Sequence, residues 1–121
     1  MKIQRFEDIE AWQIARKLTQ SIYRATNVPP FSKVFGLVDQ IRRASGSAMH
    51  NIAEGFDAGS NAEFIRFLRY AQRSSSEVQS HLYIALDEAY LSEAEFDVIY
   101  ELAAHVKAKV GGFIHYLQRA G

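Results

Sequence analysis

Apolar residues recur every three or four positions along almost the whole chain, and this spacing is the strongest constraint on its fold. At about 100° per residue, positions three and four apart fall on one face of an α-helix. The pattern forms four blocks, which predict helices over residues 7–26, 33–56, 61–90 and 93–118. No segment alternates apolar and polar residues over a useful length, so we expect no β-sheet.

The predicted inner face of each helix is a row of apolar and small residues that should pack against the other helices. The four rows are Ala11, Ile14, Ala15, Leu18, Ile22 and Ala25; Val38, Ile41, Ser45, Ala48 and Ile52; Phe64, Phe67, Leu68, Ala71, Ser75, Val78, Leu82, Ala85 and Leu86; and Phe96, Ile99, Ala103, Val106, Val110, Phe113 and Leu117. Gly111 and Gly112 lie inside the last helix at a cost of about 1 kcal/mol each relative to alanine. They mark either a frayed segment or a close helix contact.

Short turn signals separate the four blocks. Pro29 and Pro30 end the first helix, because proline lacks an amide donor and disfavours helical geometry in the preceding residue. Gly55 and Gly59 bracket the second turn, since glycine most easily adopts the left-handed conformation at a helix end.

Two Ser-x-x-Glu sequences mark the starts of the third and fourth helices. Ser60 with Glu63, and Ser92 with Glu95, predict capping boxes in which each side chain satisfies a backbone amide of the first turn. Four long helices joined by short loops predict an all-α fold, an antiparallel up-down-up-down four-helix bundle.

The composition fits a single domain over residues 1–121, with 48% hydrophobic residues. The absence of cysteine excludes disulfides and thiolate chemistry and suits a reducing compartment. No apolar run approaches the roughly 18 residues of a membrane span, so we expect a cytoplasmic protein that does not cross a membrane. Residues 1–73 hold eleven of the fourteen basic but only seven of the fourteen acidic residues. This asymmetry either orients partners or is neutralised between helices of one bundle.

The histidines do not predict a metal site. Three of them lie four residues from a carboxylate, in the pairs His50 and Glu54, Glu77 and His81, and Glu101 and His105. Di-iron bundles instead use Glu-x-x-His with all ligands pointing inward. Each pair falls opposite its apolar row, which indicates surface pairs of a few tenths of a kcal/mol. Motifs for zinc proteases, nucleotide binding and serine hydrolases are also absent. We therefore expect no metal, no cofactor and no catalytic residue.

Arginines gather on the outer face of the third predicted helix. Arg66, Arg69 and Arg73 lie within about 60° of one another, with Tyr70 beside them. Such a group could contact phosphates and stack bases, or it could be a solvated face.

A polar line runs along the second predicted helix, through Gln40, Arg43, Ser47, His50 and Glu54. Its alternating steps of three and four residues are those of a packing seam. The line predicts contact with a neighbouring subunit or with the loop that follows the helix. In the second case the carboxylate of Glu54 would accept hydrogen bonds from free amides of that turn.

The first predicted helix has a second row beside its inner face: Ile9, Trp12, Thr19 and Tyr23. A lone bundle would leave this row partly exposed. Large apolar groups outside the main row indicate a partner surface, although a wide core could also absorb them.

Three segments together resemble one known family. "FEDIEAWQIARKL", "FGLVDQIRRASGSAMHNIAEGF" and "EFIRFLRYAQRSSSEVQSHLYIALDEAYL" are similar to successive blocks of the small bacterial four-helix-bundle proteins named for intervening sequences in large-subunit ribosomal RNA. The resemblance implies a bundle that assembles into a cyclic homopentamer. For the related accessory variability proteins of diversity-generating retroelements, it implies a basic barrel that binds nucleic acid and a reverse transcriptase. The family's basic positions correspond to Arg42 and Arg43, and its NIAEG motif corresponds to residues 51–55.

Taken together, the sequence predicts a non-enzymatic, homo-oligomeric interaction module. One hypothesis is that it presents Arg42, Arg43, Arg66, Arg69 and Arg73 to RNA or DNA. The alternative is a protein-binding scaffold whose arginines pair with acids of residues 87–101 on a neighbouring subunit. The residues predicted for the subunit interface or the family motif are Ile9, Trp12, Tyr23, Ser47, His50, Asn51, Glu54 and Gly55.

Overall fold

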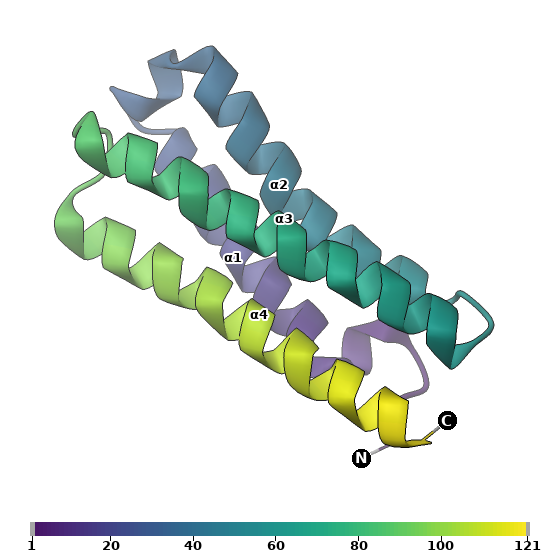
Figure 1. The fold of residues 1–121 in the computed structure, drawn as a ribbon. Helices are drawn as coiled ribbons and strands as arrows, with labels where there is room; N and C mark the ends of the chain where they lie inside the picture. The colour runs from purple at the N-terminus through teal and green to yellow at the C-terminus, as the bar shows by residue number, and fades with distance from the viewer. Residues whose placement is uncertain (1, 121) are drawn as a thin grey trace.

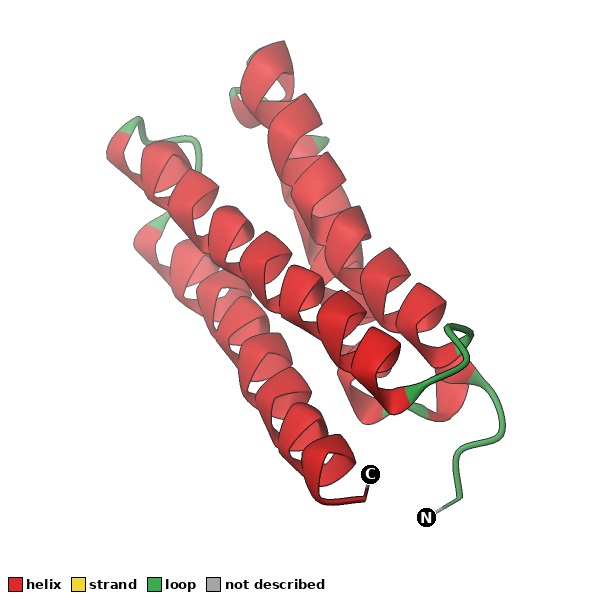
Figure 2. Cartoon of the chain, turned by 45° about the vertical axis from the view of Figure 1, so that its right-hand side comes forward, coloured by secondary structure: helices red, strands yellow, loops and turns green. Residues whose placement is uncertain are grey.

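The computed structural model describes residues 2–120, which contain four long helices and no strand. The helices are α1 (Glu10–Thr26), α2 (Phe35–Phe56), α3 (Asn61–Asp87) and α4 (Glu93–Ala120). Short 3-10 turns, η1 (Phe6–Asp8) and η2 (Phe31–Lys33), precede α1 and α2 (Figures 1 and 2). The predicted all-α fold with four helices is confirmed.

Each helix packs mainly against two others: α1 and α3 both contact α2 and α4. The short turn after α3 places the end of that helix beside the start of α4 (Figure 1). None of the helices within residues 2–120 is long and apolar enough to cross a membrane.

Two predicted helix starts were wrong because the chain breaks helical geometry there. Ile9 has φ −77° and ψ 119° and separates η1 from α1, while Val34 has φ −96° and ψ 73° and separates η2 from α2. Two predicted helix ends also differ. The helix α3 ends at Asp87, before the predicted position 90, and Ala89 in the following turn has φ +61°. The helix α4 extends two residues beyond the predicted position 118.

The buried core follows the predicted inner rows, but the buried face is wider than the predicted rows. Leu37, Ala44 and Ile114 are buried although they were not assigned to a row. Four assigned residues pack only at the edge of the core, namely Ala25, Val38, Leu86 and Phe113, and a fifth, Phe67, is half-buried. Each neighbouring helix covers one flank of the row, so burial depends on where two helices approach and not on helical phase alone.

Ile9 corrects the predicted outward row. It was expected to lie partly exposed, but its side chain is only 2% exposed and belongs to the core. The prediction assumed that the first helix continued back to residue 7. Because Ile9 is extended, the 100° helical phase does not apply to it, and its side chain turns inward.

The two predicted capping boxes differ. At Ser92 both halves form, because the Ser92 amide donates to Glu95 Oε1 at 2.8 Å and the Glu95 amide donates to Ser92 Oγ at 3.1 Å. At Ser60 the hydroxyl accepts from the Glu63 amide at 3.2 Å, but the Glu63 carboxylate binds Arg66 instead. The prediction of a complete capping box at Ser60 was therefore wrong.

The two glycines expected around the second turn have different roles. Gly59 has φ +77° and provides the left-handed turn. Gly55 is helical and buried, and a Cβ built on it would lie 2.7 Å from Cδ1 of Phe64 and 3.0 Å from Cβ of Phe67. Gly55 thus permits α2 and α3 to approach each other, which is a packing role and not a turn role.

Candidate nucleic-acid interface

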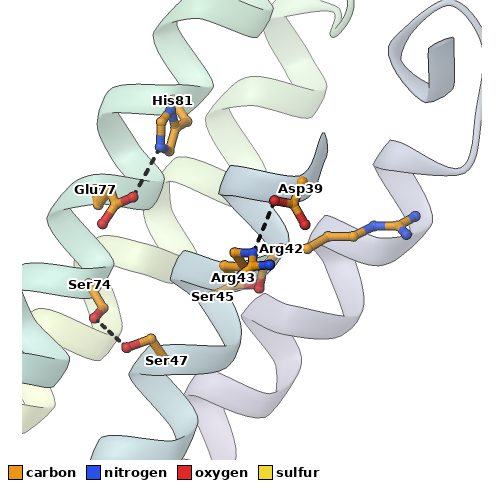
Figure 3. Close-up of polar contacts among 8 residues, drawn as sticks. All are labelled: Asp39, Arg42, Arg43, Ser45, Ser47, Ser74, Glu77 and His81. Atoms are coloured by element: carbon orange, nitrogen blue, oxygen red, sulfur yellow. Dashed lines mark hydrogen bonds and ion pairs between the residues drawn. The ribbon is translucent and has the colours of Figure 1, made fainter. Parts of the chain in front are cut away.

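The two arginines of α2 point in different directions and are both engaged (Figure 3). Arg42 extends toward α1, where its Nε donates to Thr26 Oγ1 at 2.8 Å and its Nη2 donates to Asn27 Oδ1 at 3.0 Å. Its guanidinium also lies 4.4 Å from the ring centroid of Tyr23. Arg42 therefore fastens the end of α1 to α2.

Arg43 forms an exposed ion pair with Asp39 at 3.0 Å, one turn earlier on the same helix. On α3, Arg66 is engaged in a similar way. Its Nε lies 3.0 Å from Glu63, and its Nη1 donates to the Tyr70 hydroxyl at 3.0 Å. The hydrogen bond with Glu63, followed by that with Tyr70, raises the pKa of Arg66.

Arg69 and Arg73 are exposed on α3, and within residues 2–120 neither forms an ion pair. The Arg73 guanidinium lies 5.6 Å from the centroid of Tyr70. Both arginines line an open hollow of about 390 Å³ between α3 and α4. We call this the basic hollow, and its lining residues are Arg69, Gln72, Arg73, Ser76 and Lys107.

Lys107 is the α4 residue that the sequence did not reveal as part of the site. It flanks the apolar row of its helix, directly after Val106, but helical phase does not indicate which neighbouring helix that flank faces. In the structure its Nζ donates to Gln79 Oε1 of α3 at 3.1 Å. Its carbonyl oxygen accepts from Gln72 Nε2 at 3.3 Å.

The predicted polar line of α2 is partly explained by packing within the chain. Ser47 Oγ lies 2.9 Å from Ser74 Oγ of α3 (Figure 3). Asn51 Nδ2 donates to the carbonyl and hydroxyl oxygens of Ser47, at 2.9 and 3.0 Å. Ser47 therefore belongs to the contact between α2 and α3, and Asn51 binds Ser47 from the same helix.

Glu54 corrects the prediction for the turn after α2. Within residues 2–120, no hydrogen bond of its carboxylate is found, and the side chain is exposed. The turn amides of Asp57 and Ala58 donate instead to the backbone carbonyls of Glu54 and Gly55, both at 3.1 Å. The backbone thus satisfies the amides that Glu54 was expected to bind. Glu54 and His50 border an open hollow of about 670 Å³ on the outer side of α2.

Two of the three other residues of the second row, Trp12 and Thr19, are less exposed than a solvent-facing row would be. Trp12 is half-buried and packs edge-to-face against Phe6, with ring centroids 5.1 Å apart. Thr19 donates to the carbonyl of Ser45 on α2 at 3.1 Å. Tyr23 remains 45% exposed beneath the Arg42 guanidinium.

The histidine pairs do not assemble into a metal centre. Among residues 2–120, no group of three His, Asp or Glu side chains could hold a metal ion. His81 Nε2 lies 3.2 Å from Glu77, as its spacing predicted (Figure 3), but the His81 side chain is only 14% exposed. Its Nδ1 is buried without a partner in the part of the chain that the structure describes. The expectation that this histidine lies on the outer surface was wrong.

Comparison with known proteins assigns the family. Residues 7–112 match the family model of the 23S rRNA-intervening sequence proteins, and the chain belongs to that family. A crystal structure of a protein of unknown function from the S23 ribosomal protein family of Bacteroides thetaiotaomicron has a similar fold, with a TM-score of 0.73. It is 22% identical, and the match covers 86% of this chain and 94% of that protein. No curated protein matches the chain.

Proposed function

We propose that this protein is a non-enzymatic, homo-oligomeric interaction module that binds RNA or DNA through arginines on α3. Its architecture is an antiparallel up-down-up-down bundle, as the short connections and the pairing of neighbouring helices suggest. The family resemblance supports a pentamer and, by analogy with the retroelement accessory proteins, a partner such as a reverse transcriptase.

One observation carries the nucleic-acid proposal: Arg69 and Arg73 are exposed one turn apart and form no ion pair within residues 2–120. An arginine already bound to a carboxylate must lose that contact before it can bind a phosphate. Three of the five predicted arginines, Arg42, Arg43 and Arg66, already have polar partners within the chain. The proposed nucleic-acid surface therefore centres on Arg69 and Arg73.

Binding should depend steeply on salt. Each neutralised phosphate of a single strand contributes about −0.7 to the slope of log K against log salt concentration. The double variant Arg69→Gln, Arg73→Gln should bind RNA more weakly and flatten that slope by about 1.4. Fluorescence anisotropy of labelled RNA and DNA at several salt concentrations measures both quantities. If the protein does not bind RNA or DNA at low salt, or if its affinity does not change with salt concentration, phosphate recognition is refuted.

The alternative, a protein-binding scaffold, has one observation in its favour. Exposed acids cluster around the turn between α3 and α4, at Asp87, Glu88, Glu93 and Asp97. If these acids bind the arginines of a neighbouring subunit, the double variant Arg69→Glu, Arg73→Glu should dissociate the oligomer. If the arginines bind nucleic acid, the same variant should keep its oligomeric mass in light scattering and lose only RNA or DNA binding.

A further inference from the structure

We infer that the basic hollow is a phosphate-binding site that α3 and α4 build together, in which Lys107 supplies a third cation beside Arg69 and Arg73. This inference rests on the proposed function, because it specifies the phosphate contacts on the same surface. It adds a second helix and a residue outside the arginine row.

The charge of the lining residues supports an anion as the ligand. Three of the five side chains are cationic and the other two, Gln72 and Ser76, are neutral donors, so no carboxylate lines the hollow. The hollow on α2 instead includes Asp39 and Glu54. A phosphate entering the basic hollow would meet only groups that can donate hydrogen bonds, and charge-assisted bonds of this type are the stronger ones.

The walls of the basic hollow are held in place by hydrogen bonds between the two helices. Gln72 donates to the Lys107 carbonyl at 3.3 Å, and the Lys107 ammonium donates to Gln79 at 3.1 Å. Both bonds tie α4 to α3 beside the cations. A site whose groups are already positioned loses less conformational entropy on binding.

Gly111 allows this arrangement. A Cβ built on Gly111 would lie 3.3 Å from Gln72 Nε2, closer than ordinary van der Waals contact. The missing side chain therefore leaves room for Gln72 beside the α4 backbone. Gly111 thus marks a close helix contact, one of the two explanations that its sequence left open.

Another hollow with cationic side chains, on α1, provides a matched control. Arg16 and Lys17 lie with Trp12, Gln13 and Gln20 around a hollow of about 270 Å³ on α1 alone. All its lining residues come from one helix, so no second helix supplies an opposing wall. The double variant Arg16→Gln, Lys17→Gln removes two positive charges, the same number as Arg69→Gln, Arg73→Gln removes.

The test measures binding of a short fluorescein-labelled single-stranded RNA, with either a 5′ hydroxyl or a 5′ phosphate. Lys107→Gln should weaken binding about tenfold, the loss expected for one charge-assisted hydrogen bond, and flatten the salt slope by about 0.7. Lys107→Arg and the α1 control should bind like the wild type. Circular dichroism confirms that each variant is folded.

Comparison of the two RNAs distinguishes the source of the phosphate. Equal affinity for both assigns the hollow to internal phosphodiesters of the strand. Tighter binding of the 5′-phosphorylated RNA, with the difference lost in Lys107→Gln, assigns it to a terminal phosphate. Either result supports the inference.

The remaining outcomes separate this inference from the proposed function. If Arg69→Gln, Arg73→Gln weakens RNA binding but Lys107→Gln does not, the two-helix site is refuted and the proposed function stands. A wild type that binds no RNA or DNA refutes the proposed function. Pyrophosphate is then titrated while thermal unfolding is followed. A rise in Tm for the wild type but not for Lys107→Gln supports the phosphate site, and no rise in the wild type refutes it.

Discussion

Alanine substitution of two helical glycines should change the stability of this bundle in opposite directions. Alanine is favoured over glycine inside a helix by about 1 kcal/mol. At Gly112 a new Cβ would meet no side chain or neighbouring helix of residues 2–120 within 4 Å, so Gly112→Ala should raise the free energy of unfolding by about that amount. At Gly55 the same Cβ would lie 2.7 Å from Phe64 Cδ1 and 3.0 Å from Phe67 Cβ.

The contact at Gly55 is difficult to relieve. The Phe64 ring could rotate, but Cβ of Phe67 is attached directly to the α3 backbone, so the two helices would have to separate. Overpacking of this kind costs about 1–3 kcal/mol. Because both variants gain the same helix propensity, the difference between their unfolding free energies isolates the steric cost.

Urea unfolding followed by circular dichroism measures this difference. All variants are compared at one protein concentration, since assembly would make stability depend on concentration. Gly46→Ala is an intermediate control, because its Cβ would lie 3.9 Å from His50 Nε2 in ordinary contact. A Gly55→Ala variant as stable as Gly112→Ala would refute the close approach of α2 and α3 at this position.

Three further changes test the packing and capping assignments. Ile9→Ala should lower the free energy of unfolding by about 2–5 kcal/mol, because Ile9 belongs to the core; a loss below 1 kcal/mol in urea unfolding would return it to the surface. Arg42→Met should destabilise the fold by about 1–3 kcal/mol through its lost hydrogen bonds, yet leave RNA affinity unchanged in the anisotropy assay; weaker RNA binding would show that Arg42 contacts the ligand. Hydrogen bonds from the amide and then the hydroxyl of Ser92 lower the pKa of Glu95, so its stabilising effect is present above the unfolded pKa and is lost as pH falls through the folded one. The Tm difference between wild type and Glu95→Gln should therefore shrink toward acid pH, and a constant difference would contradict this role of the carboxylate.

Most of the fold could be predicted because helical phase and turn chemistry are local properties. The inner row of α3 is an example: Leu68, Ala71, Val78 and Leu82 recur at helical spacing and are fully buried. Ile9 was misplaced because one extended residue before α1 resets the phase, and nothing in the apolar spacing marks that residue. Local patterns therefore identify helices more securely than they identify where helical geometry begins.

The candidate site was harder to predict because it depends on pairs of helices. Arg42 and Arg43 are adjacent in sequence and line the same hollow on α2, but one binds α1 and the other pairs within α2, so both guanidinium groups are already engaged. The local sequence predicts that Gly55 ends a helix, and only the position of Phe64 on α3 reveals its packing role. Lys107 and Arg69 line the same hollow because of the register between α3 and α4, and the pattern within one helix does not predict that register.

The charge asymmetry of the sequence corresponds in the structure to a change of charge along α3 and α4, from basic at one end to acidic at the other. Because α4 begins beside the end of α3, the later part of α4 lies beside the earlier part of α3 (Figure 1). Lys107 therefore joins Arg69 and Arg73, while the exposed acids Asp87 and Glu93 lie near the connecting turn. A polyanion on the basic hollow would be attracted at one end of this face and repelled at the other. If the protein binds nucleic acid as proposed, we expect the strand to leave the hollow away from the turn, because the distribution of charge, and not the net value of zero, would set the position of such a ligand.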